Sequence, residues 1–472
     1  MRMSDAEAIM WTVEKDPALR VDFTNVTILE RPPDPKRWRA KVERAVAEIP
    51  RLSHRVVSSP LRLAPPEWRR DPNLDLDYHL RTVALPAPGG LRQLLDLAGT
   101  VAAAPLDRSR PLWEFTIVEG LEGGRAALLQ KVHHTITDGV GGVKLSMSIL
   151  DFEPDPPEPP APSPVQRIAA EALAGERAEA AADPVNRTTP IEVLGDAVTY
   201  ALGQQLRRAR RGVESAVRTL ASPESARRGV ANLARLAGSV RRQLLVTEPS
   251  RSDLLRPRSL GNRFEGFQAP LSNAKAASQE LGGSVNDVFV TGVAGAMGLY
   301  HERMGVPCDE LRMAMPISTR GEGEESANSF TPSRVIVPVE PKDPVARFEI
   351  VRERLAATRG EPAVTAAGSL AGLLTMLPTS VLVGVTRSQG RTIDFATSNL
   401  RGSPVDLYVG GARIEANFPM GPRAGCGLNV TLLSYRDSLD MGINIDPAAV
   451  SDPATLLDCF DESFGALLDV AG

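Results

Sequence analysis

Two adjacent histidines, His133 and His134, are the residues whose type and setting most clearly suggest chemistry in this sequence. They open the run His133-His134-Thr135-Ile136-Thr137-Asp138-Gly139, in a chain of 472 residues that holds five histidines. A neutral imidazole has a pKa close to working pH, so it can take a proton from an alcohol whose oxygen attacks a thioester. The run therefore predicts a histidine general base.

A strand and a helix are expected to position this run. Residues 126–132 are mostly apolar and strand-like, and they lead directly into the two histidines. After Asp138 and Gly139, apolar residues recur at the spacing of one helix face, at Val140, Val143, Met147 and Leu150. A strand end, a tight loop and a helix start form a rigid setting for a catalytic base.

The composition limits the classes of protein to which the chain can belong. It is 42% hydrophobic and 24% charged, as globular proteins are, and its length favours two domains. The formal net charge of -4 gives no global basic field of the kind that binds nucleic acid. The three cysteines, Cys308, Cys426 and Cys459, form no CxxC pair, which argues against a disulfide scaffold and a thiolate zinc site. We expect no metal and no bound cofactor.

We expect a cytoplasmic protein. The first six residues lack the positive region and apolar core of a secretion signal. Residues 366–385 approach membrane-spanning length, but Gly368, Gly372, Pro378 and Gly384 interrupt them. We interpret this stretch as a buried or interfacial segment.

The chain divides into three parts by composition. Residues 1–150 alternate strand-like segments with turns and carry all four tryptophans, so they are predicted to form the first domain. Residues 151–249 hold a proline-rich linker followed by a basic, helical insert. Residues 250–472 mix helical and strand-like segments, with strands expected at 311–316 and 334–339 and a hairpin at 428–435 and 438–445. The predicted fold class is α+β, a mixed α/β protein.

The basic insert has two interpretations. Between residues 206 and 244 arginines alternate with aliphatic residues, a pattern typical of a helix lying in a membrane interface. The same pattern fits a solvated helix that packs one face on its own protein, and the arginine-rich composition of the whole chain favours this second interpretation.

The sequence resembles a known family. Residues 133–139 match the HHxxxDG signature of the CoA-dependent acyltransferase superfamily. Further segments resemble its bacterial, bifunctional wax ester synthase/diacylglycerol acyltransferase branch, namely residues 3–6, 106–114, 286–288, 316–320 and 427–431. The resemblance covers nearly the whole chain except the proline-rich and helical insert.

The resemblance implies two chloramphenicol-acetyltransferase-like lobes with a tunnel between them, where acyl-CoA enters one end and the alcohol enters the other. It implies that His134 is the general base and that His133 supports it. Asp138 would orient the loop through a charge-assisted hydrogen bond, and Gly139 would adopt a backbone geometry closed to other residues.

The resemblance also implies direct transfer to the hydroxyl of diacylglycerol or a fatty alcohol, with long-chain acyl-CoA as co-substrate. Ser318 is a candidate donor to the oxyanion, and Arg320 is a candidate partner for Asp138. The sequence contains no GxSxG motif, and none of its cysteines lies in an activating context, as expected if no acyl-enzyme forms. The implied location is peripheral, on the inner membrane or on lipid droplets.

Two further groups of residues have both a structural and a functional interpretation. Asp287 stands where the acid of a helix capping box belongs, while the resemblance places Asn286 and Asp287 in the wall of the active site. Pro111, Leu112 and Trp113 precede a strand-like segment and could equally belong to the core. Residues 399–404 depart from the Asn-Val-Pro-Gly-Pro segment of the family, so the details of the substrate tunnel and the level of activity do not carry over from the resemblance.

Two alternative functions remain. A condensation domain of peptide assembly lines shares HHxxxDG but joins carrier-bound acyl groups to amines, and this chain contains no adjoining carrier domain. A catalytically weak protein that coats neutral-lipid droplets through its basic insert is the other alternative.

Overall fold

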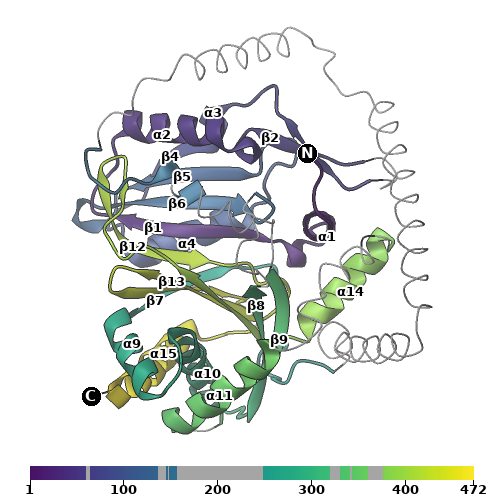
Figure 1. Cartoon of the computed structure of the whole chain (residues 1–472), viewed down its shortest axis with the longest axis vertical. Coiled ribbons are helices and arrows are strands. Elements are labelled where there is room, and N and C mark those ends of the chain that lie inside the picture. The colour runs from purple at the N-terminus through teal and green to yellow at the C-terminus, as the bar shows by residue number, and fades with distance from the viewer. Residues whose placement is uncertain are drawn as a thin grey trace, which may run out of the picture.

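Two six-stranded β-sheets form the framework of the protein (Figure 1). The computed structural model describes residues 1–59, 64–136, 145–146, 148–156, 248–318, 330–340, 343–359, 375 and 377–471, and it gives only the backbone of residues 317–318, 330–332 and 471. The predicted insert at 151–249 therefore lies almost entirely outside the described residues. Most of the helix expected after Gly139 also lies outside them, and so do residues 366–374 of the apolar stretch.

The first sheet has the strand order β11-β12-β1-β6-β5-β4. Its strands are β1 (Asp22–Leu29), β4 (Leu80–Ala84), β5 (Trp113–Glu119), β6 (Ala126–His133), β11 (Tyr408–Val409) and β12 (Ala412–Met420). β6 lies between β1 and β5, and seven of its eight residues are buried. The apolar run that leads into the histidines is thus a strand, as predicted, and the structure places it in the middle of the sheet.

Four helices and a small sheet accompany the first sheet. They are α1 (Asp5–Val13), α2 (Pro35–Glu48), α3 (Leu76–His79) and α4 (Leu91–Ala103), with β2 (His54–Val57) paired to β3 (Glu67–Arg70). α2 begins where the Asp34 side chain accepts from the N–H of Arg37, followed by Pro35 at the first helical position. Short 3-10 turns lie at Pro17–Leu19 (η1), Pro50–Leu52 (η2) and Glu122–Gly124 (η4).

The second sheet has the order β7-β14-β13-β10-β8-β9. Its strands are β7 (Arg263–Pro270), β8 (Glu310–Ser318), β9 (Phe330–Pro338), β10 (Phe395–Arg401), β13 (Leu428–Tyr435) and β14 (Ser438–Ile445). The strands predicted at 311–316 and 334–339 correspond to β8 and β9. The predicted hairpin is confirmed as β13 and β14, with Arg436 at a positive φ of 54° in the turn.

Helices cover the second sheet and enclose its core (Figure 1). They are α9 (Leu271–Glu280), α10 (Val285–Arg303), α11 (Pro344–Arg359) and α15 (Pro453–Leu468), and the chain ends in the short turn η5 (Asp469–Ala471). Phe460 and Phe464 of α15 pack on Phe267 of β7, with ring centroids 5.6 and 5.3 Å from it. A separate helix, α14 (Thr379–Arg391), lies beside α1.

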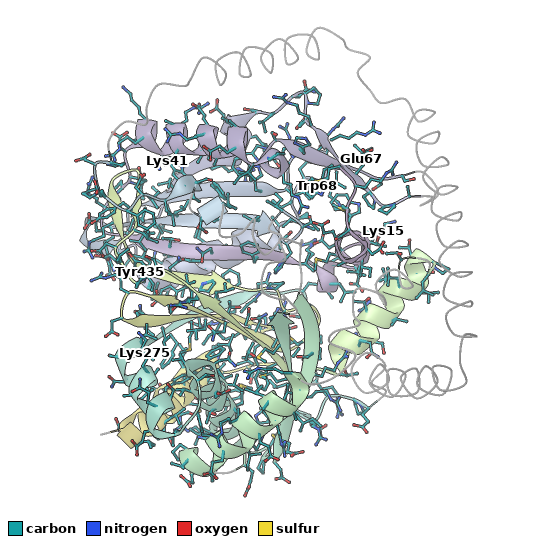
Figure 2. All side chains as sticks on the ribbon, in the orientation of Figure 1. Lys15, Lys41, Glu67, Trp68, Lys275 and Tyr435 are labelled. Carbon is teal, nitrogen blue, oxygen red and sulfur yellow. The ribbon has the colours of Figure 1, made fainter. Side chains whose placement is uncertain are left out.

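Strands β11 and β12 connect the two halves of the molecule. They come from the C-terminal part of the chain, but β12 pairs with β1 and completes the first sheet. Tyr435 of β13 donates its hydroxyl to the carbonyl of Ile414 in β12, and it lies where the two sheets meet (Figure 2). Two strands from beyond the predicted boundary at residue 250 therefore belong to the first sheet. The domain boundaries themselves stay a prediction.

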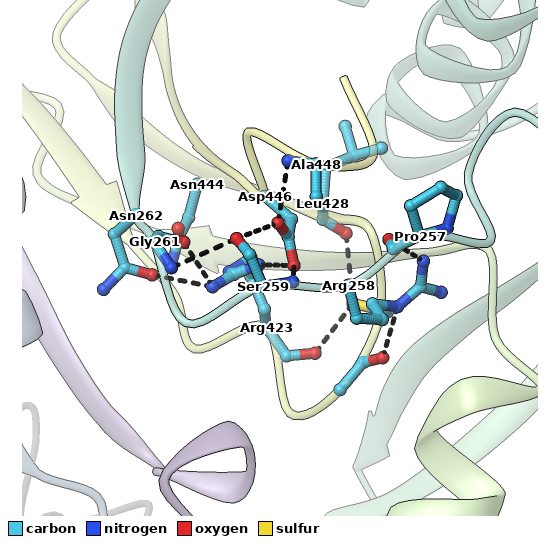
Figure 3. Close-up of polar contacts among 12 residues, drawn as sticks. Pro257, Arg258, Ser259, Gly261, Asn262, Arg423, Leu428, Asn444, Asp446 and Ala448 are labelled. Carbon is cyan, nitrogen blue, oxygen red and sulfur yellow. Dashed lines mark hydrogen bonds and ion pairs between the residues drawn. The ribbon is translucent and has the colours of Figure 1, made fainter. Parts of the chain in front are cut away.

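A buried polar network fixes the start of the second lobe (Figure 3). Asp446 accepts from the N–H of Ser259 at 2.8 Å and from the N–H of Ala448 at 3.0 Å, and it pairs with Arg423 at 2.5 Å. Arg423 also donates to the carbonyl of Gly261 at 2.6 Å. These contacts fasten the segment before β7 to the loops on either side of β13 and β14.

In the described ranges, no helix combines the length and the apolar character that a membrane crossing requires.

Candidate functional site

The two histidines lie at the end of the central strand β6, where the chain turns. The N–H of Ile136 donates to the carbonyl of His133 at 2.9 Å, which closes the turn around His134. The N–H of His133 donates to the carbonyl of Leu112, the residue just before the neighbouring strand β5, at 3.0 Å. The predicted rigid setting is therefore present on the strand side of the site.

The ring of His133 is fixed at both nitrogens. Its Nδ1 accepts from the N–H of Thr135 at 3.1 Å and lies 2.6 Å from the Thr135 hydroxyl. The other polar contact of the ring is made by Nε2. That nitrogen lies 2.9 Å from the carboxylate of Glu14, and His133 is only 1% exposed. His133 is thus a buried anchor, which fits the supporting role expected for it.

His134 is the first residue of the turn that follows β6. Its ring meets the ring of Phe23 edge-on, with centroids 5.4 Å apart. Part of the residue stays exposed, but the surrounding protein is dense, and this burial lowers the pKa of His134 to about 4. The neighbouring His133 lowers the pKa as well, and Glu14 raises it. At neutral pH the imidazole is uncharged, which is the state that a general base requires.

Two carboxylates accompany the histidines. Burial raises the pKa of Asp22 to about 6, and the nearby carboxylate of Glu14 adds to the effect. Burial also acts to raise the pKa of Glu14, but its hydrogen bond and charge interaction with His133 and the N–H of Val21 bring the pKa below its ordinary value. The site therefore holds Glu14 ionised while Asp22 titrates close to the physiological range.

Glu14, Asp22 and His133 each bring one ligand-type atom to within 4.8 Å of the others. Side chains of these types can hold a divalent cation. His133 Nε2 and the Glu14 carboxylate lie 2.9 Å apart, so a cation would have to bind where these two atoms already meet. The expectation of a site without metal stays a prediction.

Several residues of the predicted site lie outside the described part. Asp138, Gly139 and Arg320 are among the residues that the structure does not describe, and Ser318 is described as backbone at the end of β8. The proposed pairing of Asp138 with Arg320 and the proposed oxyanion contact of Ser318 therefore stay predictions, as does the tunnel.

Pro111, Leu112 and Trp113 lie next to the histidine turn, residues 133–136. Trp113 is fully buried, and its ring nitrogen donates to the carbonyl of Leu52 at 2.9 Å. His79 stacks on the same ring at 4.4 Å, and its Nδ1 lies 2.7 Å from the Trp113 carbonyl. These contacts favour the structural interpretation, in which the segment supports the strand that carries His133.

Asn286 and Asp287 lie at the start of α10. The Asp287 carboxylate accepts from the N–H of Ser284 at 2.8 Å, and the Ser284 hydroxyl accepts from the N–H of Asp287 at 3.3 Å. Asp287 thus forms the capping box that its spacing predicted. Asn286 accepts from the side chain of Asn399 at 3.2 Å, so the structure brings this pair to the end of β10, in the segment that departs from the family pattern.

Sequence analysis missed several residues that hold the histidine turn. Glu14, Asp22, Thr135 and Arg51 each contact the histidine turn or lie beside it. Thr135 could have been found, because it lies inside the motif. Glu14 and Asp22 lie far from it in the chain, and no spacing rule connects them to His133.

Comparison with known proteins places the chain among lipid acyltransferases. Residues 3–289 match the wax ester synthase/diacylglycerol acyltransferase catalytic domain, and residues 327–468 match the WS/DGAT C-terminal domain. A Mycobacterium tuberculosis protein named as a diacylglycerol O-acyltransferase is 36% identical over 100% of this chain and 93% of its own length. A second protein so named, from the same organism, is 29% identical over 100% of this chain and 97% of its own length.

Solved structures share the fold. The wax ester synthase/diacylglycerol acyltransferase from Marinobacter aquaeolei VT8 matches with a TM-score of 0.64 at 20% identity, over 100% of both chains. The first condensation domain of the calcium-dependent antibiotic synthetase matches with a TM-score of 0.58 at 16% identity, over 100% of this chain and 96% of its own. These matches confirm the predicted mixed α/β fold with two lobes.

Proposed function

Because the chain belongs to the wax ester synthase/diacylglycerol acyltransferase family, we propose that it transfers a long-chain acyl group from acyl-CoA to a hydroxyl. The acceptor is diacylglycerol, which gives triacylglycerol, or a long-chain alcohol, which gives a wax ester. The observation that carries this proposal is the placement of the HHxxxDG histidines at the end of β6, where His133 is held between Thr135 and Glu14 and His134 follows it directly.

In the proposed reaction, His134 takes the proton of the acceptor hydroxyl while its oxygen attacks the thioester carbonyl carbon. The resulting tetrahedral oxyanion collapses, the carbon–sulfur bond breaks, and the imidazolium returns its proton to the leaving CoA thiolate. No covalent enzyme intermediate forms. His133 holds the turn, and Asp138 is proposed to orient the loop that follows.

The oxyanion requires at least one hydrogen-bond donor in a fixed position. Ser318, at the end of β8, is our candidate, and Arg320 is our candidate partner for Asp138 across the lobes. Both assignments derive from the family resemblance, and both belong to the same proposal.

We further propose that the protein works at a lipid surface. Both acceptors are water-insoluble, so the enzyme must collect them from a membrane or a lipid droplet. The arginine-rich insert at residues 206–244 carries the charge and the aliphatic residues that such contact would use. This would place the protein peripherally on the inner membrane or on droplets.

A panel of acceptors tests the proposal. Purified protein is given radiolabelled palmitoyl-CoA with dioleoylglycerol, with hexadecanol, or with hexadecylamine, and the lipid products are separated and counted. We expect triacylglycerol or wax ester, with free CoA released in equal amount, and neither product from the His134→Ala variant.

Other outcomes would contradict the proposal. Transfer to the amine alone, or transfer only from an acyl-carrier protein, would support a condensation-type enzyme. Binding to dioleoylglycerol-containing vesicles without any acyl transfer would support a lipid-coating protein. The condensation-domain structures share the fold, so this comparison has to be made by chemistry.

A further inference from the structure

Helix α1 carries two buried carboxylates that point toward the histidine turn. Glu7 lies in its first turn and is 1% exposed, and Glu14 is the C-cap residue directly after Val13, with a side chain that is 9% exposed. Seven residues make about two helical turns, so the two side chains lie on one face. The family segment at residues 3–6 opens this helix, and neither acid entered the predicted site.

Glu14 holds the ring of the first histidine. Its Oε1 lies 2.9 Å from His133 Nε2, and the same oxygen accepts from the N–H of Val21 at 3.0 Å. The carboxylate therefore has a fixed position of its own, and it lies against Nε2 of the His133 ring. With Thr135 on Nδ1, the ring cannot rotate without losing this hydrogen bond and the close contact with Glu14.

Glu7 holds the other side of the turn through Arg51. The guanidinium pairs with Glu7 at 2.6 Å and donates to the carbonyl of Thr135, which is completely buried. Glu7 is itself fixed by the capping box at Ser4, whose N–H donates to it at 2.7 Å. The two acids thus reach both residues that flank His134.

The opposite side of α1 is also held in place. Val13, which ends α1, forms a small apolar cluster with Leu19 and with Leu382 of α14. Asp16, just after the helix, pairs with Arg387 of α14 at 3.1 Å. The helix therefore contacts the histidine turn on one side and α14, from the second half of the chain, on another; Figure 1 shows α1 and α14 side by side.

We infer that α1 positions the histidine turn, with Glu14 as a positioning residue that acts on His134 through His133. The inference rests on the proposed function of His134 and adds an element outside the HHxxxDG run. Glu14 fixes the orientation of the His133 ring and places a negative charge where the imidazolium of His134 forms during transfer. Other charged groups around the pair in the described part are Asp22, Lys131, Arg20 and Arg108.

Two substitutions of Glu14 separate its charge from its hydrogen bond. Glu14→Gln keeps an acceptor of the same shape, and we expect kcat to fall about tenfold, the effect of roughly one pKa unit. Glu14→Ala removes both contributions, and we expect a fall of about a hundredfold from a displaced base. KM should stay near the parental value, because neither change touches substrate. Asp5→Asn, on an exposed residue of the same helix, should leave kcat unchanged.

A double variant tests whether Glu14 acts through His133. Glu14→Ala in a His133→Ala background should lower kcat by no more than about twofold further, because the two changes remove one interaction. Hydrogen exchange gives a readout that needs no turnover. The amides of Thr135 and Ile136 should exchange faster in Glu14→Ala than in the parent or in Asp5→Asn.

Parental kcat in Glu14→Gln and Glu14→Ala would overturn the inference, and so would additive effects in the double variant or unchanged exchange at residues 135–136. If Glu14→Ala does not fold, Glu14→Gln decides alone. These experiments test the inference and the proposed function independently. If His134→Ala loses activity while the Glu14 variants keep the parental kcat, only the role of Glu14 is refuted. Full activity in His134→Ala refutes the base itself.

Discussion

The backbone carbonyl of Leu112 accepts the N–H of His133 at 3.0 Å. Two segments that the sequence singled out separately, residues 111–113 and residues 133–139, are therefore joined directly, strand to strand. The first buries a tryptophan behind the second, so the packing of Trp113 and the placement of the histidine turn depend on each other.

Substitution of Trp113 should lower stability and activity together. Trp113→Phe keeps most of the apolar volume but leaves the buried carbonyl of Leu52 without its donor, at a cost of about 1–3 kcal/mol. Trp113→Ala also creates a cavity and should cost about 3–5 kcal/mol. Urea unfolding measures the loss of stability. Trp38→Phe, in the same core but away from the turn, should lower stability and leave kcat per folded molecule unchanged.

His134→Ala should remove catalysis without unfolding the protein. We expect kcat to fall at least about a hundredfold, as loss of a general base usually does, while the thermal midpoint changes little. Unchanged turnover in steady-state assays would refute the assignment.

The lowered pKa of His134 should be visible in the pH dependence of kcat/KM for the parent protein. Because the folded pKa is lowered from 6.5 to about 4, the imidazole stays a free base until the pH falls to that region. We expect kcat/KM to fall with decreasing pH near 4 rather than near 6.5, provided the protein stays folded, which circular dichroism would monitor. Because the pKa of His134 is lower in the folded protein than in the unfolded chain, the contribution of His134 to folding stability is present above pH 6.5. That contribution is lost as the pH falls through 4.

Asp22 should show the opposite pH dependence. Its folded pKa is raised from 3.8 to about 6, so its contribution to stability is present below pH 3.8 and is lost as the pH rises through 6. Asp22→Asn should therefore stabilise the protein at pH 7.5 by about 1–3 kcal/mol, since one pKa unit corresponds to about 1.4 kcal/mol. The gain should vanish near pH 4. Thermal midpoints at both pH values measure it, with the exposed Asp461→Asn as control; equal gains at both pH values would contradict the assignment.

Gly442 tests the close approach between the two sheets. A Cβ at this position of β14 would lie 2.2 Å from the carbonyl oxygen of Pro419 in β12, so one of the strands must move. We expect Gly442→Ala to destabilise the protein by about 1–3 kcal/mol, as overpacking does. Gly465→Ala, on an exposed turn of α15 with no atom within 4 Å, should be neutral or stabilise by up to about 1 kcal/mol. Denaturant midpoints of both variants provide the comparison.

The sequence by itself determined those features that depend on neighbouring residues. The spacing of Ser284 and Asp287 predicted a capping box, and α10 begins there. Alternating and apolar runs predicted β6, β8, β9 and the β13–β14 hairpin, because strand formation and tight turns depend on short-range pattern. The HHxxxDG run identified His133 and His134 for the same reason, since the motif is contiguous in the chain.

Tertiary structure alone decided what surrounds these elements. β12 joins β1 from the far end of the chain, and no local pattern specifies which strand becomes its neighbour. Glu14 reaches His133 because α1 packs beside the end of β6, and the pKa values of His134 and Asp22 depend on burial, which is a property of the assembled fold. Local chemistry is encoded along the chain, whereas the orientation of the His133 ring and the pKa of His134 depend on contacts between residues that only folding brings together.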